Sequence, residues 1–242
     1  IQENQTQDLG ELVLNRIGEA GGVMVVIKDG DIYIQNADGT NQRKLIEGTI
    51  TNSSISPTGR YIVYSSDDPV EGDSEIYLLD LIASTIATLT DNLVADLYPC
   101  FSPDEQKIAF SSVRLGRLDI CMMDINGEDE EDLTNTSWAD ETYPSFSPDG
   151  RYILFSSSAS PGEICLMNKD GTNIIQLTDN TLNDTEPIFN PDQSLIAYNS
   201  DNNIYTMKPD GSDKKKLTEG TSPKFSPDGK EIAFLYSNTL YT

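Results

Sequence analysis

Three carboxylates recur at one position of a repeated pattern in this sequence. Asp96, Glu141 and Asp184 each stand three residues before a proline, and Asp140 precedes the second of them. Hard cations such as Ca²⁺ prefer several oxygen ligands, so a ring of these side chains would bind Ca²⁺ or attract a basic side chain of a partner. The alternative is a structural role, in which each carboxylate caps a turn or accepts backbone N–H groups.

A second group of residues suits contact with a protein partner. Trp138 is the single tryptophan and lies in the segment NTSWADETYP, and Tyr98 and Tyr143 directly precede two of these prolines. Large rings with one polar atom are common anchors in protein interfaces. Arg114 and Arg117, in SSVRLGRLD, add positive charge. We predict that these residues contact a protein or peptide; for the aromatic residues the alternative is packing between neighbouring repeats.

The segment SSDDPVEGDSE is the densest acidic stretch near these residues. It contributes Asp67, Asp68, Glu71, Asp73 and Glu75. Their spacing differs from that of an EF-hand calcium loop. We therefore expect an exposed, solvated acidic loop here in preference to a metal site.

The sequence limits the chemistry that an active site could use. It contains no histidine, which excludes Ser-His-Asp and Cys-His catalysis and imidazole metal sites. It also lacks a GxSxG elbow and a Walker phosphate loop. A carbohydrate- or peptide-active enzyme would have to use a carboxylate or a tyrosine, and forty acidic residues bring carboxylates together by chance. Catalysis stays open as the last of three alternatives.

The charge balance narrows the classes of partner. Sixteen basic and forty acidic residues give a formal net charge of -24. Nucleic acid and anionic lipid are disfavoured, because phosphates would be repelled over much of the surface. Cations and basic protein faces are favoured, although an acidic coat also serves solubility alone. No apolar run approaches the roughly twenty residues that span a bilayer, so we expect no membrane insertion.

Two anchors repeat along the chain and define the elements that position these residues. The first is the proline of a Ser/Asn-Pro turn, and the second is an isoleucine in a short apolar run; the repeats lie roughly 36 to 46 residues apart, the size of a propeller blade. The prolines are Pro57, Pro103, Pro148, Pro191 and Pro227, and the isoleucines are Ile32, Ile76, Ile120, Ile164 and Ile204.

Each unit is predicted to form four strands. In the clearest copy these are residues 142–147, 151–157, 163–168 and 173–178, separated by SPDG, a variable loop and KDGT. Asp-Gly favours tight hairpins because Gly accepts positive φ. A four-stranded sheet cannot bury both faces alone, so radial stacking into a ring is expected. The three cysteines fall inside predicted strands without metal-binding spacing, which favours buried free thiols.

The repeated turns and apolar anchors resemble the repeat of the TolB-like, WD40-like PD40 β-propeller family, in which an apolar anchor precedes Ser-Pro-Asp-Gly and a short IAF strand. The resemblance covers roughly residues 23–242. It departs from the pattern at Thr58 and in the pairs Asp104-Glu105 and Asp192-Gln193, which lack the turn glycine. The resemblance implies a protein-binding scaffold, often in exported or envelope settings, and transfers no partner-specific residue.

The expected fold is therefore an all-β propeller of four-stranded blades, in which six blades fit best and five remain an alternative. Residues 23–242 form the propeller, and residues 1–22 are an N-terminal segment. Within it ELVLNRI supplies the inner strand of the first blade or the outer strand of the last, unless residues 8–19 form a short helix. The start at Ile1, followed by QENQTQDLG, is typical of a chain after signal-peptide removal or of the edge of an expressed fragment. We expect a periplasmic or extracellular protein.

Three functions remain in competition. The first is a noncatalytic scaffold that presents loops and an acidic channel mouth to a protein or peptide. The second is a propeller that binds calcium or another cation. The third is the enzyme without histidine described above.

Overall fold

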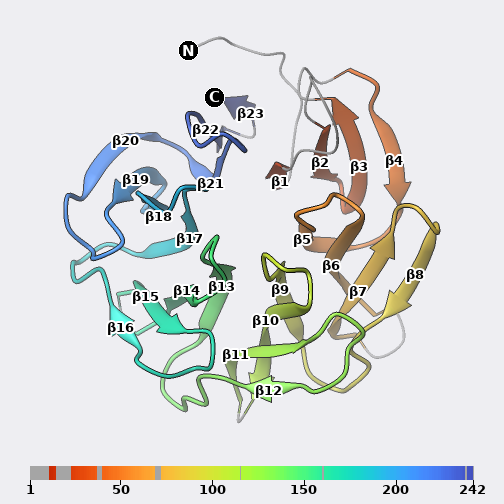
Figure 1. The fold of residues 1–242 in the computed structure, drawn as a ribbon, viewed down its shortest axis with the longest axis horizontal. Coiled ribbons are helices and arrows are strands. Elements are labelled where there is room, and N and C mark those ends of the chain that lie inside the picture. Colours follow the sequence, from red (N-terminus) through yellow and green to blue (C-terminus); the bar gives the residue numbers. More distant parts are fainter. Residues whose placement is uncertain are drawn as a thin grey trace.

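The chain forms a ring of β-sheets around a central axis, with one strand of each sheet near the centre and one at the periphery (Figure 1). The computed structural model describes residues 11–14, 23–36, 40–68, 72–114, 116–159, 161–237 and 239–241. Pairing joins the strands into five four-stranded sheets and one three-stranded sheet. All pairs are antiparallel, as short hairpin connections require. Within these residues no helix is long and apolar enough to cross a bilayer.

The sheets follow one another along the sequence. The first contains β1 (Glu11–Leu14), β2 (Val23–Lys28), β3 (Asp31–Asn36) and β4 (Arg43–Ile46), and the second contains β5 (Ile50–Ile55), β6 (Tyr61–Asp67), β7 (Ser74–Asp80) and β8 (Thr85–Thr88). The third contains β9 (Asp96–Phe101), β10 (Lys107–Arg114), β11 (Arg117–Asp124) and β12 (Glu131–Asp132), and the fourth contains β13 (Glu141–Phe146), β14 (Tyr152–Ser157), β15 (Glu163–Asn168) and β16 (Ile175–Gln176). The fifth contains β17 (Asp184–Phe189), β18 (Ile196–Ser200), β19 (Asn203–Met207) and β20 (Lys215–Glu219), and the last contains β21 (Thr221–Phe225), β22 (Ile232–Tyr236) and β23 (Thr239–Tyr241).

The predicted all-β propeller of four-stranded blades is confirmed. Five blades are complete, and a sixth sheet has three strands. Strand β1 pairs with β2 as the inner strand of the first sheet; the rest of the segment 8–19 lies outside the described residues. The ring closes where β1 packs against β21, and in the described part of the chain no strand is shared between the first and last sheets.

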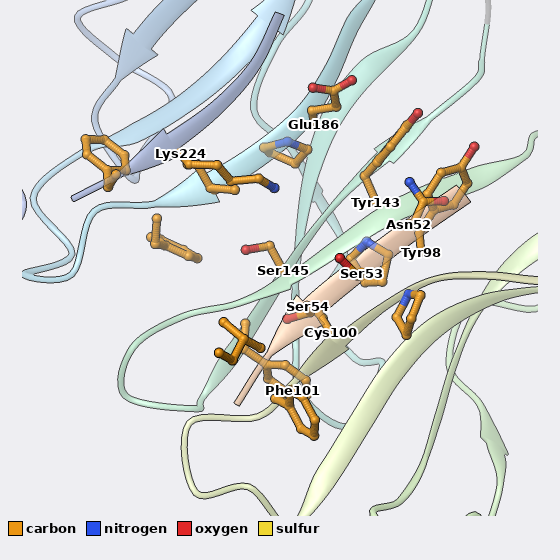
Figure 2. Close-up of a pocket in the computed structure, with 18 of the residues that line it drawn as sticks. Asn52, Ser53, Ser54, Tyr98, Cys100, Phe101, Tyr143, Ser145, Glu186 and Lys224 are labelled. Atoms are coloured by element: carbon orange, nitrogen blue, oxygen red, sulfur yellow. The ribbon is translucent and has the colours of Figure 1, made fainter. Parts of the chain in front are cut away.

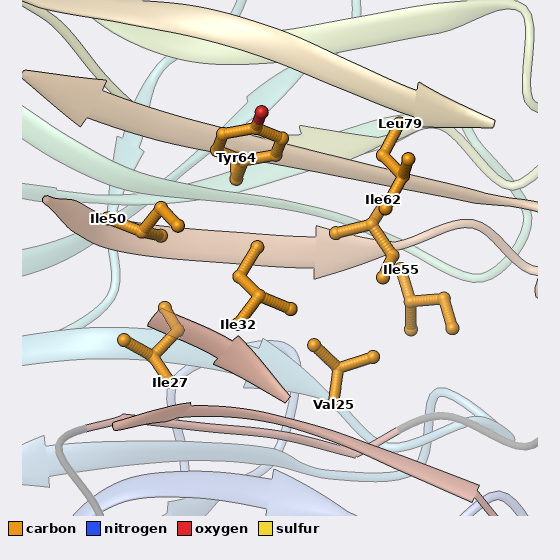
Figure 3. Close-up of a cluster of buried hydrophobic side chains, with 8 residues drawn as sticks. All are labelled: Val25, Ile27, Ile32, Ile50, Ile55, Ile62, Tyr64 and Leu79. Carbon is orange, nitrogen blue, oxygen red and sulfur yellow. The ribbon is translucent and has the colours of Figure 1, made fainter. Parts of the chain in front are cut away.

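The hydrophobic core is divided among the contacts between neighbouring blades. Figure 3 shows one of these layers, in which Val25 and Ile32 of the first sheet pack against Ile55 and Ile62 of the second. Similar layers join the later sheets in turn. The repeated anchor isoleucines are fully buried: Ile32, Ile76, Ile120, Ile164 and Ile204 are each 0% exposed. Each blade is therefore stabilised by its neighbours, as expected for a repeat protein.

The Ser-Pro-Asp-Gly word forms the turn between the first two strands of a blade. In the fourth sheet, Gly150 donates its N–H to the Ser147 carbonyl at 2.8 Å and adopts φ 68°. The Ser147 hydroxyl accepts the Tyr152 N–H at 3.0 Å and donates to the Asp149 carboxylate at 2.6 Å. Two copies that lack glycine keep the same conformation, with φ 57° at Glu105 and 60° at Gln193. The turn therefore depends on the left-handed residue, which glycine adopts at the lowest cost.

Five described inner strands carry a register shift, and four of them share one form of β-bulge, in which two residues face one residue of the second strand. Residues 98–99, for example, lie opposite Phe110, because Leu97 pairs with Ser111 and Cys100 pairs with Ala109. The second residue of each bulge is a proline, which has no N–H to lose from the ladder. The first adopts left-handed φ of 53–56° at Tyr98, Tyr143, Glu186 and Ser222. These bulges bend the inner strands where they line the centre of the ring.

Candidate functional site: the central channel

A cavity of ≈ 650 Å³ occupies the centre of the ring and is lined by the inner strands β5, β9, β13, β17 and β21. Figure 2 shows its walls, with side chains from several blades directed at the same space. The five prolines of the Ser/Asn-Pro turns lie at one end. The other end lies where the inner strands begin. We call the latter end the channel mouth and define it by Asn52, Tyr98, Tyr143, Glu186 and Ser222.

Two tyrosines of the channel mouth contact each other. The ring centroids of Tyr98 and Tyr143 are 4.1 Å apart and the rings are tilted by 39°. Both residues were predicted to bind a partner, and the structure brings them together in the channel wall, half-buried. Glu186 follows them around the mouth and adds a carboxylate. Its position is readable from the sequence, because TEP stands where the two preceding repeats have LYP and TYP.

The next level of the channel contains one residue from each of five strands. Ser54, Cys100, Ser145, Ile188 and Lys224 occupy equivalent register positions and line the cavity. Lys224 is the cationic side chain of this lining. Burial raises the pKa of the Cys100 thiol to about 12, so this thiol stays neutral. The sequence pattern gave no reason to select Lys224, since the other repeats place uncharged residues there.

The structure places the three carboxylates predicted for the channel mouth in separate blade junctions, away from the cavity lining. Asp96, Glu141 and Asp184 are 0%, 3% and 0% exposed and begin strands in three different blades. They do not line the cavity. No group of three or more Asp, Glu or Cys side chains suited to a metal ion occurs in the described ranges. The residues are drawn into the protein because the linkers between blades use their oxygens as hydrogen-bond acceptors.

A linker residue connects two carboxylates at each of these blade junctions. At the junction of the fourth and fifth sheets, Asn180 donates its backbone N–H to Glu163 at 3.0 Å and its side-chain amide to Asp184 at 2.6 Å. Asn92 makes the same pair of bonds at the junction of the second and third sheets, to Glu75 at 2.9 Å and Asp96 at 2.8 Å. Each pair thus fixes the linker between consecutive blades, close to the alternative role expected from the sequence.

The third junction uses threonine and brings two carboxylates into contact. Thr136 donates its N–H to Asp119 at 2.6 Å and its hydroxyl to Glu141 at 3.0 Å. Burial raises the pKa of Glu141 to about 7 despite hydrogen bonds from Thr134 and Thr136, and the neighbouring Asp119 carboxylate adds to the rise. Burial also raises the pKa of Asp119. The pair is therefore favourable when one carboxyl carries a proton and donates it to the other.

The remaining predicted contact residues lie around the mouth or outside the described residues. Trp138 is 66% exposed in the linker that leads into β13, the strand of Tyr143. Arg117 is exposed and forms an ion pair with Asp140 at 3.2 Å. Arg114 pairs with Arg117 through the backbone of the β10–β11 hairpin, and its side chain lies outside the described residues. The role of these residues in binding remains a prediction.

The predicted acidic loop is only partly exposed. Asp67 is exposed and accepts the Ser74 hydroxyl at 2.7 Å, whereas Glu75 is 2% exposed in the blade junction already described. Glu71 lies outside the described residues. Glu75 is buried because it lies at the start of β7, directly after Ser74, where the N–H of the linker residue Asn92 needs an acceptor.

Comparison with known proteins agrees with this architecture. The model of the PD40 family, described as the TolB beta propeller domain, matches residues 23–163 and 144–240. An uncharacterized protein of Agrobacterium fabrum is 30% identical over 185 residues, which are 70% of this chain and 62% of that protein. A TolB homolog of Chlorobium chlorochromatii is 50% identical over 44 residues, 18% of this chain and 10% of its own length. The chain thus spans less than two thirds of either relative.

Solved structures show the same ring. The structure of a putative TolB from Agrobacterium tumefaciens matches with a TM-score of 0.81 at 26% identity, covering 92% of this chain and 88% of that one. TolB from Acinetobacter baumannii matches with a TM-score of 0.74 at 22% identity, covering 86% of this chain and 54% of that one. A structure of a nidogen/laminin complex matches with a TM-score of 0.74 at 13% identity, covering 88% and 84%. The last two likenesses show the fold alone.

Proposed function

Because this chain belongs to the PD40 family of TolB β-propeller domains, we propose that it is a noncatalytic interaction scaffold that binds a protein or peptide at its channel mouth. The observation that carries the proposal is the ≈ 650 Å³ cavity, whose mouth holds the Tyr98–Tyr143 pair. A cavity of this size lies within the range of ligand-binding pockets. The rigid ring around it lets a partner bind without ordering the site first.

The chemistry of the mouth favours a partner with apolar and basic groups. The tyrosine faces offer apolar contact area, and Glu186 places a carboxylate in the same wall. The net charge of -24 also attracts basic segments at long range. Trp138, exposed in the linker that enters β13, offers a second anchor for a partner that extends beyond the mouth.

The comparisons support binding as the class of function. The chain matches the model of the TolB beta propeller domain over residues 23–163 and 144–240, and a propeller of this family is expected to act as a protein-binding scaffold. The family assignment also supports a periplasmic or extracellular location, which fractionation of cells that produce the native protein would test. If the protein is found in the cytosolic fraction, the proposed location is wrong.

A selection experiment tests the proposed function. A random peptide library displayed on phage would be selected on the immobilised protein and counter-selected on the Tyr98→Ala/Tyr143→Ala double variant. Enriched peptides would then be synthesised and titrated by calorimetry. We expect the double variant to bind them at least about tenfold more weakly, because two central aromatic anchors are lost.

The control is Tyr152→Ala, which removes a half-buried tyrosine at the far end of β14 from the mouth. It should leave the affinity unchanged. Trp138→Ala reports whether the bound segment reaches the linker. If no peptide is enriched, or if the enriched peptides bind the double variant as tightly as the wild type, the channel mouth is not the binding site. Thermal melts of each variant establish that the ring is intact.

A further inference from the structure

Lys224 brings a positive charge into the channel of a strongly acidic protein. It lies on β21, the inner strand of the last sheet, in register with Ala233 of β22. It is partly buried and belongs to the cavity lining. Figure 2 shows its amine directed into the cavity, between Glu186 and Ser145 in this view.

The described residues do not neutralise this charge. Seven other cationic side chains form ion pairs with carboxylates, among them Arg60 with Asp80 and Arg117 with Asp140. No carboxylate of the described residues lies within 4 Å of the Lys224 amine. The neighbouring Cys100 thiol stays protonated. An ammonium withdrawn from bulk water gains most from a negatively charged partner.

Two hydroxyl groups stand at the same level of the channel. Ser54 and Ser145 occupy the register positions equivalent to Lys224 in two other inner strands. Both serines are partly exposed and line the cavity, so their hydroxyls are available to a ligand there. One ammonium and two hydroxyls converging on a cavity form a donor set suited to a carboxylate.

We propose that the level formed by Lys224, Ser54 and Ser145 is a carboxylate-binding subsite, and that it receives a carboxylate of the bound peptide. The inference rests on the proposed function and specifies the chemistry of its ligand. A small free anion is a poor occupant, because the net charge of -24 repels it at long range. A peptide that also carries a basic residue overcomes this repulsion, since Glu186 stands two residues nearer the mouth along the equivalent strand.

The carboxylate can come from a peptide C-terminus or from an Asp or Glu side chain, and the experiment distinguishes them. Pools of N-acetylated hexapeptides with one Arg would be made in three forms: with a free C-terminus, with a C-terminal amide, and with a C-terminal amide plus one Asp. Binding at about 150 mM salt would be measured by affinity selection with mass spectrometry. The proteins compared are the wild type, Lys224→Met, Lys224→Arg and the control Lys216→Met, which changes an exposed lysine of β20.

We expect the wild type to retain the free-acid pool, the Asp pool or both over the neutral amide pool by at least tenfold. Lys224→Met should abolish this preference, Lys224→Arg should keep much of it, and Lys216→Met should match the wild type. If peptides bind equally with and without a carboxylate, the subsite is refuted while the scaffold function stands. If no pool binds, the proposed function fails as well. Direct binding of trigalacturonate that Lys224→Met abolishes, with no peptide pool bound, would assign the subsite to a sugar acid and overturn the proposal.

Discussion

Glu141 shows how a residue that suits a cation can instead serve the framework. Its carboxyl is buried beside Asp119 and accepts the Thr136 hydroxyl. In the folded protein its pKa is about 7, against an ordinary value of 4.5. Between these two pH values the folded state holds a proton that the unfolded chain has released. Raising the pH therefore removes stability.

The first prediction follows from this sign. The contribution of Glu141 to the free energy of unfolding is fully present below about pH 4.5 and declines by about 1.4 kcal/mol per pH unit until about pH 7. Glu141→Gln, which imitates the protonated acid, should be more stable than the wild type at pH 8 and should show a smaller loss between pH 5 and pH 8. Urea unfolding at several pH values measures both.

Glu219→Gln is the matched control, since it removes the same formal charge from an exposed position of β20. If Glu141→Gln and Glu219→Gln give parallel curves, the proton of Glu141 does not contribute to stability.

At the scale of the element, the Ser/Asn-Pro turn occurs in this protein both with glycine and with a longer side chain at its left-handed position, so the two residue types can be compared. Gly150 and Gln193 occupy the same left-handed position, with φ 68° and 60°. A residue with a side chain costs about 1 kcal/mol in this conformation relative to glycine. A Cβ atom added at Gly150 would lie 3.6 Å from the Cδ of Pro103, an ordinary contact distance. A steric clash therefore does not add to the cost of the left-handed conformation.

The second prediction uses these two turns in opposite directions. Gln193→Gly should raise the free energy of unfolding by about 1 kcal/mol, and Gly150→Gln should lower it by a similar amount. Chemical denaturation of both variants provides the measurement. Changes of the same sign in the two turns would show that backbone conformation is not the controlling term.

The elements also show what sequence reasoning can reach. The strands predicted at residues 142–147, 151–157 and 163–168 correspond to β13, β14 and β15, because turn segments and an anchor isoleucine mark their positions in the sequence. The direction of a side chain at the start of a strand was not predictable. Asp96 faces a linker while Tyr98, two residues later, faces the channel. The bulge begins at Tyr98, and its geometry depends on pairing with β10, in which the opposing Phe110 is more than ten residues away in the sequence.

Lys224 was missed for a related reason. The pattern identifies β21 as an inner strand, but the segment SPKFSPDG, which contains the lysine, has the composition of an exposed turn. Only closure of the ring places it opposite Ser54 and Ser145. A residue whose surroundings are formed by distant blades cannot be identified as part of a site from the local sequence.

At the scale of the whole molecule, the net charge of -24 is spread over a ring whose core is divided into layers. Such charge destabilises the compact state by self-repulsion. The described ion pairs are mostly exposed and contribute little in compensation. Salt should therefore stabilise the protein, because the Debye length falls to about 10 Å at 0.1 M and less above it.

The third prediction is a rise of a few degrees in the unfolding midpoint between about 0.05 and 0.5 M NaCl at pH 8. The effect should nearly vanish near the isoelectric point of ≈ 4.1, where the repulsion is absent. Differential scanning calorimetry at both pH values measures how the unfolding midpoint depends on salt. A midpoint that falls with salt at pH 8 would mean that attractive pairs outweigh the repulsion.

At the bulges of the inner strands, the residues on the channel side differ between blades, whereas the opposing residues are of one type. In four inner strands the bulge places two residues opposite one aromatic residue of the second strand: Tyr98-Pro99 opposite Phe110, Tyr143-Pro144 opposite Phe155, Glu186-Pro187 opposite Tyr198 and Ser222-Pro223 opposite Phe234. The aromatic side is uniform and the channel side differs from blade to blade. Mutations at the mouth can therefore change the chemistry of the channel surface one blade at a time, while the aromatic residues opposite the bulges stay the same.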